Sequence, residues 1–151
     1  MDALDGVGKL YGCQAMASGV SPQIQAGFGN VGGGMAVASE MAYFTFMEQD
    51  AKMFVNAPFV IAENDADNSS AEYQAKETGN VCATGSEKEI FTEIRNLVSI
   101  LPANNEDDMS YSECEDDFNR ICTDIENCDG DTSIALSMIS DDRFYMEMKT
   151  D

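Results

Sequence analysis

Apolar residues recur at helical spacing in several stretches of the chain, and each such stretch predicts a helix. The first begins almost at the first residue, and Gly19 and Pro22 end its pattern. The clearest one is preceded by Ser86 and carries Glu89, which together are the sequence of a capping box, and Pro102 follows it. The predicted helices cover residues 2–17, 35–42, 71–78, 87–101 and 132–139.

Short apolar and β-branched stretches between the helices predict strands. They cover residues 22–28, 43–47 and 52–55, and the first leads through the glycine-rich run 29–34 into the helix expected at 35–42. Helices that alternate with short buried strands are typical of an α/β fold.

The second part of the chain differs in composition from the first. Acidic residues become dense beyond the predicted helix at 87–101, so we expect a domain boundary within residues 102–112. Farther along, Phe118, Ile121 and Ile125 are expected to form a short apolar face.

The charge balance and the absence of histidine exclude several classes of function. The 151 residues include 28 acidic and 8 basic ones, a net charge of -20. Such a surface repels phosphate backbones and acidic membranes, so no nucleic-acid partner is expected. Without histidine the chain lacks the usual general base and a common metal ligand. Triad hydrolases and His-ligated zinc enzymes are therefore excluded, and we expect no metal site.

The five cysteines include no Cys-x-x-Cys pair, which favours reduced, mostly buried thiols over a zinc or redox site. The acidic tail does not match a calcium-binding EF-hand loop, because Ile125 and Leu136 occupy essential ligand positions. No signal sequence opens the chain and no apolar run reaches the ~18 residues of a membrane helix. We therefore expect a cytoplasmic protein that does not insert into a membrane.

The glycine-rich run has three interpretations that the residues alone leave open. Its glycines could simply let the backbone turn and a helix pack closely. Residues 27–32 also satisfy the dinucleotide-binding pattern G-x-G-x-x-G, with Glu48 as a possible ribose ligand about 20 residues on. Finally, backbone N–H groups at a glycine turn and helix start could form an oxyanion hole, which stabilises negative charge on a thioester oxygen.

Five segments, in this order and spacing, closely resemble a known family. They are ASGVSPQI (residues 17–24), GNVGGG (29–34), FTFM (44–47), MFV before Pro58 (53–55) and LPANN (101–105). The family comprises the carboxyltransferase subunits of biotin-dependent acyl-CoA carboxylases and decarboxylases. The resemblance covers essentially the whole chain and implies a crotonase-like α/β fold, a superhelix of ββα units with two related lobes per subunit. Residues 1–105 would be part of the N-terminal lobe, and residues 106–151 an acidic linker and the beginning of the C-terminal lobe.

The resemblance also implies a reaction and the residues that carry it. In this family an acyl-CoA thioester and carboxybiotin meet between two subunits, and peptide N–H groups stabilise both enolates. Gly33 and Gly34 would supply half of an oxyanion hole, and Gly29, Asn30 and Gly32 would lie against the substrate. The cofactor is biotin on a separate carrier, and the substrate is a CoA thioester. The implied partners are a biotin carboxyl carrier protein, further copies of the subunit, and biotin carboxylase or membrane decarboxylase subunits.

The other half of the oxyanion hole would lie upstream of the first residue, so the resemblance implies an internal piece of a longer enzyme. Loss of one oxyanion donor typically costs ~100-fold or more in rate. A second hypothesis is therefore a truncated, non-catalytic chain that only associates with full-length subunits, and a third is a dinucleotide-binding module. One departure from the family is Tyr43, which stands where the family commonly has Asp.

Overall fold

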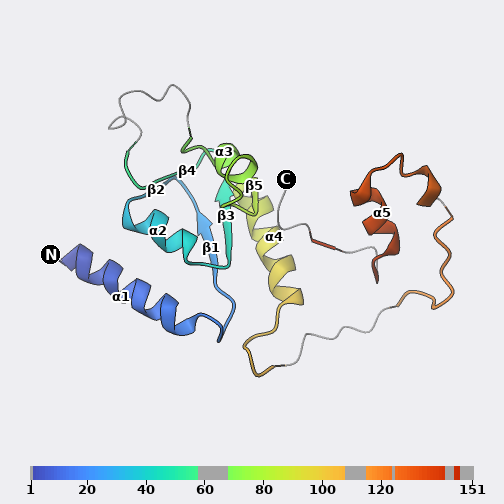
Figure 1. Ribbon diagram of the computed structural model, residues 1–151, viewed down its shortest axis with the longest axis horizontal. Helices are drawn as coiled ribbons and strands as arrows, with labels where there is room; N and C mark the ends of the chain where they lie inside the picture. The colour runs from blue at the N-terminus through green and yellow to red at the C-terminus, as the bar shows by residue number, and fades with distance from the viewer. Residues whose placement is uncertain (1, 58–67, 108–114, 124, 142–144, 147–151) are drawn as a thin grey trace. The chain divides into compact units, whose positions relative to one another are not determined.

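The computed structural model describes residues 2–57, 68–107, 115–123, 125–141 and 145–146 (Figure 1). The described residues fall into two compact units, one formed by residues 2–107 and the other by the described residues from 115 to 146. The predicted assignment of residues 1–105 and 106–151 to the lobes of a larger subunit stays a prediction.

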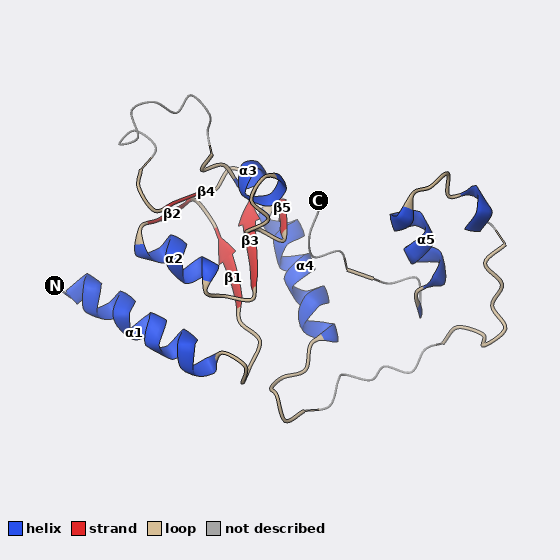
Figure 2. Ribbon diagram, viewed as in Figure 1, coloured by secondary structure: helices blue, strands red, loops and turns tan. Residues whose placement is uncertain are grey.

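The strands described in the first unit form two parallel sheets, drawn in red in Figure 2. In one sheet β3 (Phe44–Glu48) lies between β1 (Ile24–Gly27) and β5 (Ala83–Gly85), and in the other β2 (Asn30–Gly32) pairs with β4 (Lys52–Phe54). The three strands predicted from the sequence are confirmed as β1, β3 and β4.

Strands β2 and β5 lie where the sequence predicted none. β2 is part of the glycine-rich run, which was expected to be a turn, and it consists of an Asn, a Val and a Gly. Such residues carry no strand pattern, so pairing with β4 determines their conformation. β5 is equally short and is held by its neighbour, since the Cys82 N–H donates to the Thr45 carbonyl at 2.7 Å.

The four helices predicted in this unit are confirmed, with ends that differ by at most two residues. They are α1 (Asp2–Ala17), α2 (Gly34–Glu40), α3 (Ala71–Lys76) and α4 (Glu87–Ile100). The capping box of α4 is also confirmed. The Ser86 hydroxyl accepts the Glu89 N–H, and the Glu89 carboxylate accepts the Ser86 N–H at 2.8 Å.

The core of the first unit lies between the sheets and the helices that cover them. Phe46 and Met47 of β3 are fully buried. Helix α4 contacts β3 and β5, and its residues Ile90 and Leu97 are buried. The other apolar residues of α4 are less buried, and Phe91 packs against Phe28, with ring centroids 5.5 Å apart. Among the methionines, Met47 and Met53 are buried in this core, whereas Met16 and Met35 are exposed.

The second unit contains a single turn of 3-10 helix, Ile125–Asn127, and helix α5 (Thr132–Ile139). The predicted helix is confirmed, and Asp131 caps it by accepting the N–H groups of Ser133 and Ile134. The predicted apolar face is wrong, because Phe118 and Ile121 are exposed and pack against no core.

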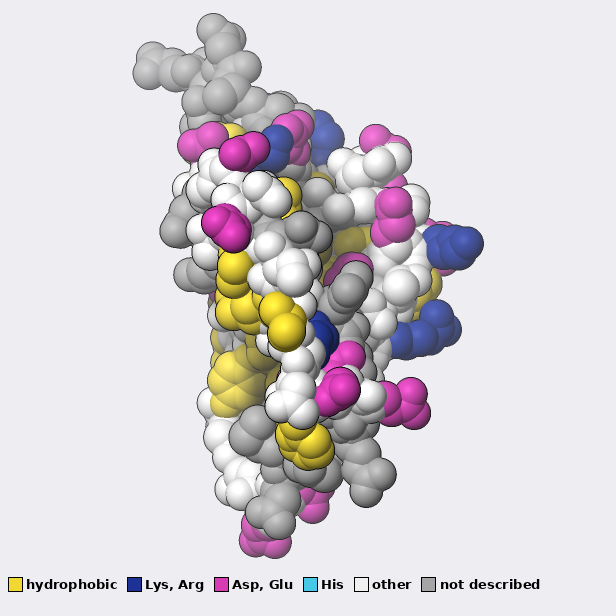
Figure 3. Space-filling model, turned by 90° about the vertical axis from the view of Figure 1, so that its right-hand side faces the viewer, with side chains coloured by type: hydrophobic (Ala, Val, Ile, Leu, Met, Phe, Trp, Pro, Cys, Tyr) yellow, Lys and Arg dark blue, Asp and Glu magenta, His cyan; other side chains and the backbone are white. Residues whose placement is uncertain are grey.

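Acidic side chains are scattered over the face drawn in Figure 3, and hydrophobic side chains reach the surface between them. In the described part of the chain no helix is long and apolar enough to cross a membrane. Four of the cysteines are described, all as free thiols. The prediction of burial is confirmed for Cys128 and wrong for Cys13, and Cys114 lies outside the described residues.

Candidate active site

The glycine-rich run connects the carboxyl end of β1 to the start of α2. Gly29 and Gly33 have φ angles of 80° and 59°, a left-handed conformation that residues with a Cβ rarely adopt. A Cβ placed on either one would meet no atom within 4 Å. The backbone at these two positions therefore borders open space, as a ligand that approaches peptide N–H groups requires.

The two predicted oxyanion donors differ in their hydrogen bonding. The Gly33 N–H donates to the Phe54 carbonyl at 2.9 Å, which fastens the turn to the end of β4. The Gly34 N–H opens α2 and donates to no group in the described part of the chain. Only Gly34 therefore offers an unengaged N–H, and Gly33 could act as a donor only by releasing Phe54.

Two of the glycines are also needed for packing. A Cβ on Gly32 would lie 2.9 Å from the ring of Phe54, and a Cβ on Gly34 would lie 2.9 Å from Cγ1 of Val7 on α1. The interpretation that these glycines allow close packing is thus confirmed for both positions. It does not compete with an oxyanion role, because the N–H and the Cα hydrogens of Gly34 point in different directions.

The remaining predicted site residues lie in the same short segment. Asn30 begins β2 and is exposed, as is Gly29 before it. The structure thus places all five predicted site residues between β1 and α2, at the carboxyl end of a parallel strand. Ligands of parallel α/β sheets commonly bind at this end.

The dinucleotide-binding interpretation is wrong. That motif needs a strand that turns directly into a helix, whereas strand β2 of a second sheet intervenes here between β1 and α2. Gly27 is buried within β1 itself, where a Cβ would lie 2.9 Å from the Val31 side chain. The carboxylate of Glu48 accepts the N–H of Asp50 at 3.0 Å and closes a local turn.

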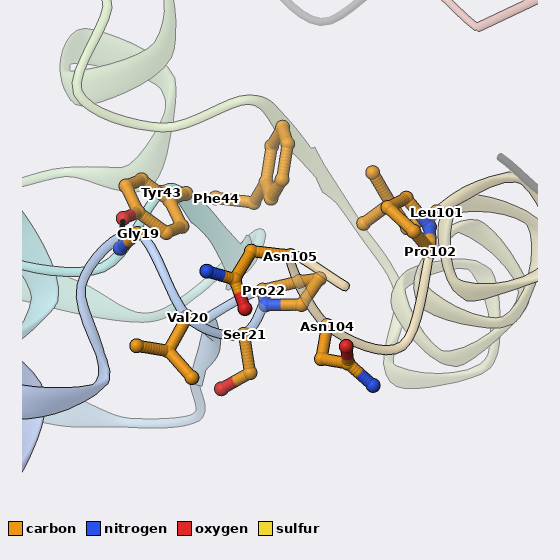
Figure 4. A pocket seen from close by; sticks show the side chains of 10 residues that line it. All are labelled: Gly19, Val20, Ser21, Pro22, Tyr43, Phe44, Leu101, Pro102, Asn104 and Asn105. Atoms are coloured by element: carbon orange, nitrogen blue, oxygen red, sulfur yellow. Dashed lines mark hydrogen bonds between the residues drawn. The ribbon is translucent and has the colours of Figure 1, made fainter. Parts of the chain in front are cut away.

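An apolar groove of about 500 Å³ lies at the opposite, amino ends of β1 and β3 (Figure 4). In Figure 4 the segment before β1 and the start of β3 face the chain that follows α4. The lining residues are Gly19, Val20, Ser21, Pro22, Tyr43, Phe44, Leu101, Pro102, Asn104 and Asn105. Because it contains none of the predicted site residues, we do not assign the reaction to this groove.

Tyr43 replaces the expected Asp at the edge of this groove and makes polar contacts of its own. Its hydroxyl accepts the Gly19 N–H at 2.5 Å and shares a 2.9 Å hydrogen bond with the Ser18 hydroxyl. These bonds, first that with Ser18 and then that with Gly19, lower the pKa of the Tyr43 phenol. Tyr43 thus fixes the turn that follows α1. Its departure from the family pattern is the only sign of this role in the sequence.

The contribution of Phe54 to the site was missed by sequence reasoning. It acts through its backbone carbonyl, which every residue has, and through a ring that covers Gly32. No side-chain pattern marks such a role in advance.

Comparison with known proteins places these features in context. The family described as "Carboxyl transferase domain" matches residues 1–150. The chain is 33% identical over 127 residues to the methylmalonyl-CoA decarboxylase subunit alpha of Propionigenium modestum, a match that covers 79% of this chain and 25% of that protein. It is 34% identical over 134 residues to the propionyl-CoA carboxylase carboxyltransferase subunit of Haloferax mediterranei, covering 83% and 26% of the two chains. The chain spans about a quarter of the length of these relatives.

The fold is shared with solved carboxyltransferases. The crystal structure of transcarboxylase 12S, a hexamer with methylmalonyl-CoA and methylmalonic acid bound, superimposes with a TM-score of 0.83 at 25% identity. This match covers 96% of the present chain and 31% of that one. The beta subunit of geranyl-CoA carboxylase from P. aeruginosa has the same fold, with a TM-score of 0.57. The predicted crotonase-like α/β fold is confirmed.

Proposed function

Because the chain belongs to the carboxyl transferase domain family, we propose that it is part of an acyl-CoA carboxyltransferase, which transfers a carboxyl group between an acyl-CoA and biotin. The observation that carries the proposal is the likeness, over 96% of the chain, to transcarboxylase 12S with methylmalonyl-CoA bound. Relatives named as a methylmalonyl-CoA decarboxylase subunit and a propionyl-CoA carboxylase subunit support the same reaction class.

The chemistry requires stabilisation of an enolate. When the thioester gains or loses its carboxyl group, negative charge develops on the thioester oxygen, and fixed N–H groups lower the energy of that charge. The free N–H of Gly34 is the donor proposed to meet this oxygen, and Gly33 is proposed to join it when its N–H leaves the Phe54 carbonyl. Gly29, Asn30 and Gly32 would form the adjacent substrate surface, with open space at Gly29 for the thioester.

Biotin, when bound, supplies the ureido nitrogen that gives or takes the carboxyl group. We place it on a separate carrier protein or domain, as the resemblance implies. The open space at Gly29 and Gly33 fits such a group, because neither position has a neighbour within 4 Å of a Cβ. Further subunits of the same kind, a carrier protein, and a biotin carboxylase or membrane decarboxylase subunit complete the proposed set of partners.

The second candidate is a non-catalytic chain that associates with full-length subunits. It is favoured by the share of the relatives that the chain spans, 25% and 26%, and by the single free N–H at the proposed oxyanion hole. One donor alone leaves the developing charge under-stabilised. On this proposal the parent protein is an enzyme and the 151-residue chain alone is inactive.

A transfer assay on two samples tests both candidates. Methylmalonyl-CoA serves as the carboxyl donor and free biotin as the acceptor, with the protein isolated intact from its source in one sample and the 151-residue chain in the other. Transfer by the intact protein alone supports a carboxyltransferase of which this chain is a part. If the isolated species has the mass of this chain, transfers nothing and copurifies with a larger carboxyltransferase, the second candidate is correct.

A matched pair of variants locates the site in the active sample. Gly33 and Gly19 both have a positive φ and open space around a Cβ, so Gly33→Ala and Gly19→Ala carry similar backbone strain. We expect the first to lower kcat, because its methyl group would enter the open space proposed for the substrate, and the second to leave kcat nearly unchanged. Equal losses in both variants would contradict the assignment of the site to Gly33 and Gly34.

A further inference from the structure

Two thiols of the second unit converge on one methionine of α5. The Cys122 thiol donates to the Met138 carbonyl at 3.2 Å, and the Cys128 thiol donates to Sδ of the same methionine at 3.9 Å. Cys128 is buried, whereas Cys122 and Met138 are partly buried. One thiol thus lies at the backbone of Met138 and the other at its side chain. The proposed carboxyl transfer uses none of these three residues.

The spacing of two of the sulfurs suits a shared metal ion. Metal–sulfur bonds are ~2.3 Å long, so two sulfurs bound to one trigonal ion lie ~4 Å apart. The 3.9 Å between Sγ of Cys128 and Sδ of Met138 agrees with that separation. An ion between these two sulfurs therefore requires little movement of either side chain.

Cys122 can join them once its thiol loses its proton. A thiolate donates no hydrogen bond, so nothing then holds Sγ of Cys122 at the Met138 carbonyl. That carbonyl keeps a partner, because Nη1 of Arg120 donates to it at 2.9 Å. The sulfur of Cys122 is then free to rotate about the Cα–Cβ bond and bind the ion, and no buried carbonyl is left unpaired.

The set of donor atoms favours Cu(I) over other metal ions. Thiolates and thioethers are soft ligands, which Cu(I) prefers. Structural zinc takes four ligands and calcium takes oxygen, and no three His, Cys, Asp or Glu side chains gather into such a site in the part of the chain that the structure describes. The sequence predicted no metal site because it lacks histidine and a Cys-x-x-Cys pair, but a site with a thioether ligand requires neither.

The charge beside the three sulfurs fits the same ion. Cu(I) bound by two thiolates and one thioether carries one net negative charge. The Arg120 guanidinium bonds to the carbonyl that Cys122 also contacts, so a positive charge lies next to the site. An ion pair with Asp116 at 3.3 Å and a 2.9 Å bond to the Ser140 carbonyl hold the guanidinium in place. A fixed cation at this distance stabilises an anionic complex.

We propose that Cys122, Cys128 and Met138 form a binding site for Cu(I) in the second unit. On binding, each thiol releases its proton to water, two copper–thiolate bonds and one copper–thioether bond form, and the copper is neither oxidised nor reduced. The argument uses only contacts within this unit, so it is independent of the proposed carboxyl transfer.

Metal titration of the 151-residue chain tests the site. Cu(I) is added under nitrogen with ascorbate as reductant, and a chromophoric chelator of Cu(I) competes for it. We expect one Cu(I) per chain at the highest affinity. The bound ion should protect Cys122 and Cys128 from alkylation and leave the exposed Cys13 reactive, which peptide mass mapping measures. Alkylation of Cys122 and Cys128 at the same rate with and without Cu(I) would overturn the proposal.

A matched pair of methionine variants tests the thioether. Met138→Leu removes the sulfur and nearly keeps the volume of the side chain. It should lower the affinity for Cu(I) by about tenfold or more, since even the outer partners of metal ligands are worth that much. Met16→Leu makes the same change at an exposed position of α1 and should leave the affinity unchanged. An equal affinity in the two variants would contradict a site that includes Met138.

Cysteine variants test the thiolates. Cys122→Ser and Cys128→Ser should each lose the tight site, whereas Cys13→Ser should retain it. Far-ultraviolet circular dichroism of the metal-free variants checks that the fold is kept, and Cys122→Ser, at the less buried position, decides the outcome if Cys128→Ser fails to fold. Full affinity in Cys122→Ser would overturn the proposal. So would displacement of the bound Cu(I) by an equal concentration of Zn²⁺, because three sulfur ligands favour the softer ion.

Discussion

The hydroxyl of Tyr11 donates a 2.6 Å hydrogen bond to the carbonyl of Gly34 and so joins α1 to the first residue of α2. One turn farther along, Nε2 of Gln14 donates to the Ala38 carbonyl at 2.8 Å. The two bonds fix the register of α1 along α2. Since Gly34 also carries the free N–H of the proposed oxyanion hole, α1 determines where that N–H lies.

The close contact between Val7 and Gly34 predicts a stability loss that a second substitution relieves. A Cβ at position 34 would lie 2.9 Å from Val7 Cγ1 and 3.1 Å from the Tyr11 hydroxyl. We expect Gly34→Ala to lower the free energy of unfolding by about 1–3 kcal/mol through overpacking. In the double variant with Val7→Ala the loss should be smaller than the sum of the two single losses. Urea denaturation of the parent chain, the two single variants and the double variant measures these losses. Strictly additive losses would contradict the contact.

The hydrogen bonds of Tyr43 predict that its phenol ionises below its ordinary pKa of 10.0. Bonds from Ser18 and Gly19 stabilise the phenolate and lower its pKa in the folded state. A group whose folded pKa is depressed adds stability as pH rises through that pKa, so unfolding should become harder over the first part of the alkaline range. Ultraviolet titration of the phenols should lose the step that belongs to this lowered pKa in Tyr43→Phe. Tyr73→Phe, which leaves these bonds intact, should retain that step.

The capping box of α4 predicts a loss of stability in acid. The Ser86 hydroxyl and the Ser86 N–H both bond to the Glu89 carboxylate and lower its pKa from the ordinary value of 4.5. This contribution is present above the unfolded pKa and is lost as pH falls through the lower folded value. Glu89→Gln should flatten the dependence of the melting temperature on pH below 4.5. Glu93→Gln on the same helix removes one negative charge and leaves the capping box intact, so it is the matched control. An equal effect of both variants would show that the loss of one negative charge, and not the loss of the capping box, changes the pH dependence.

The charge of the chain predicts stabilisation by salt. With a net charge of -20 and few ion pairs in the described residues, the folded state carries strong self-repulsion. Salt shortens the screening length from about 30 Å at 0.01 M to about 3 Å at 1 M, so the melting temperature should rise with sodium chloride. A rise of the same size in sucrose, which screens no charge, would contradict the electrostatic explanation.

The parts of the fold that sequence reasoning predicted are those with strong local signals. Ser86 and Glu89 mark a helix start by their side chains alone, and the apolar residues of β3 mark a buried strand. β2 could not be predicted, because Asn30 and Gly32 become a strand only through pairing with β4. The same holds for β5, which has no apolar alternation of its own.

The position of the candidate site stays a prediction from sequence, and the hydrogen bonds of its N–H groups could not be predicted. The glycines and the resemblance pointed to residues 29–34. That Gly33 is engaged by Phe54 while Gly34 is free depends on how β4 ends beside α2, a long-range contact that no local pattern encodes. Prediction failed similarly for Phe118 and Ile121, whose apolar character suggested burial although their unit has little core.

The strands of the larger sheet pair in the order in which they occur along the chain, β1 with β3 and β3 with β5. During synthesis each of these strands therefore emerges after the strand that it pairs with, and none of the three has to insert between two strands already paired. Loop closure at each step spans a single strand and helix, which keeps its entropic cost low. The topology allows these three strands to pair stepwise during synthesis, each one serving as the template for the next.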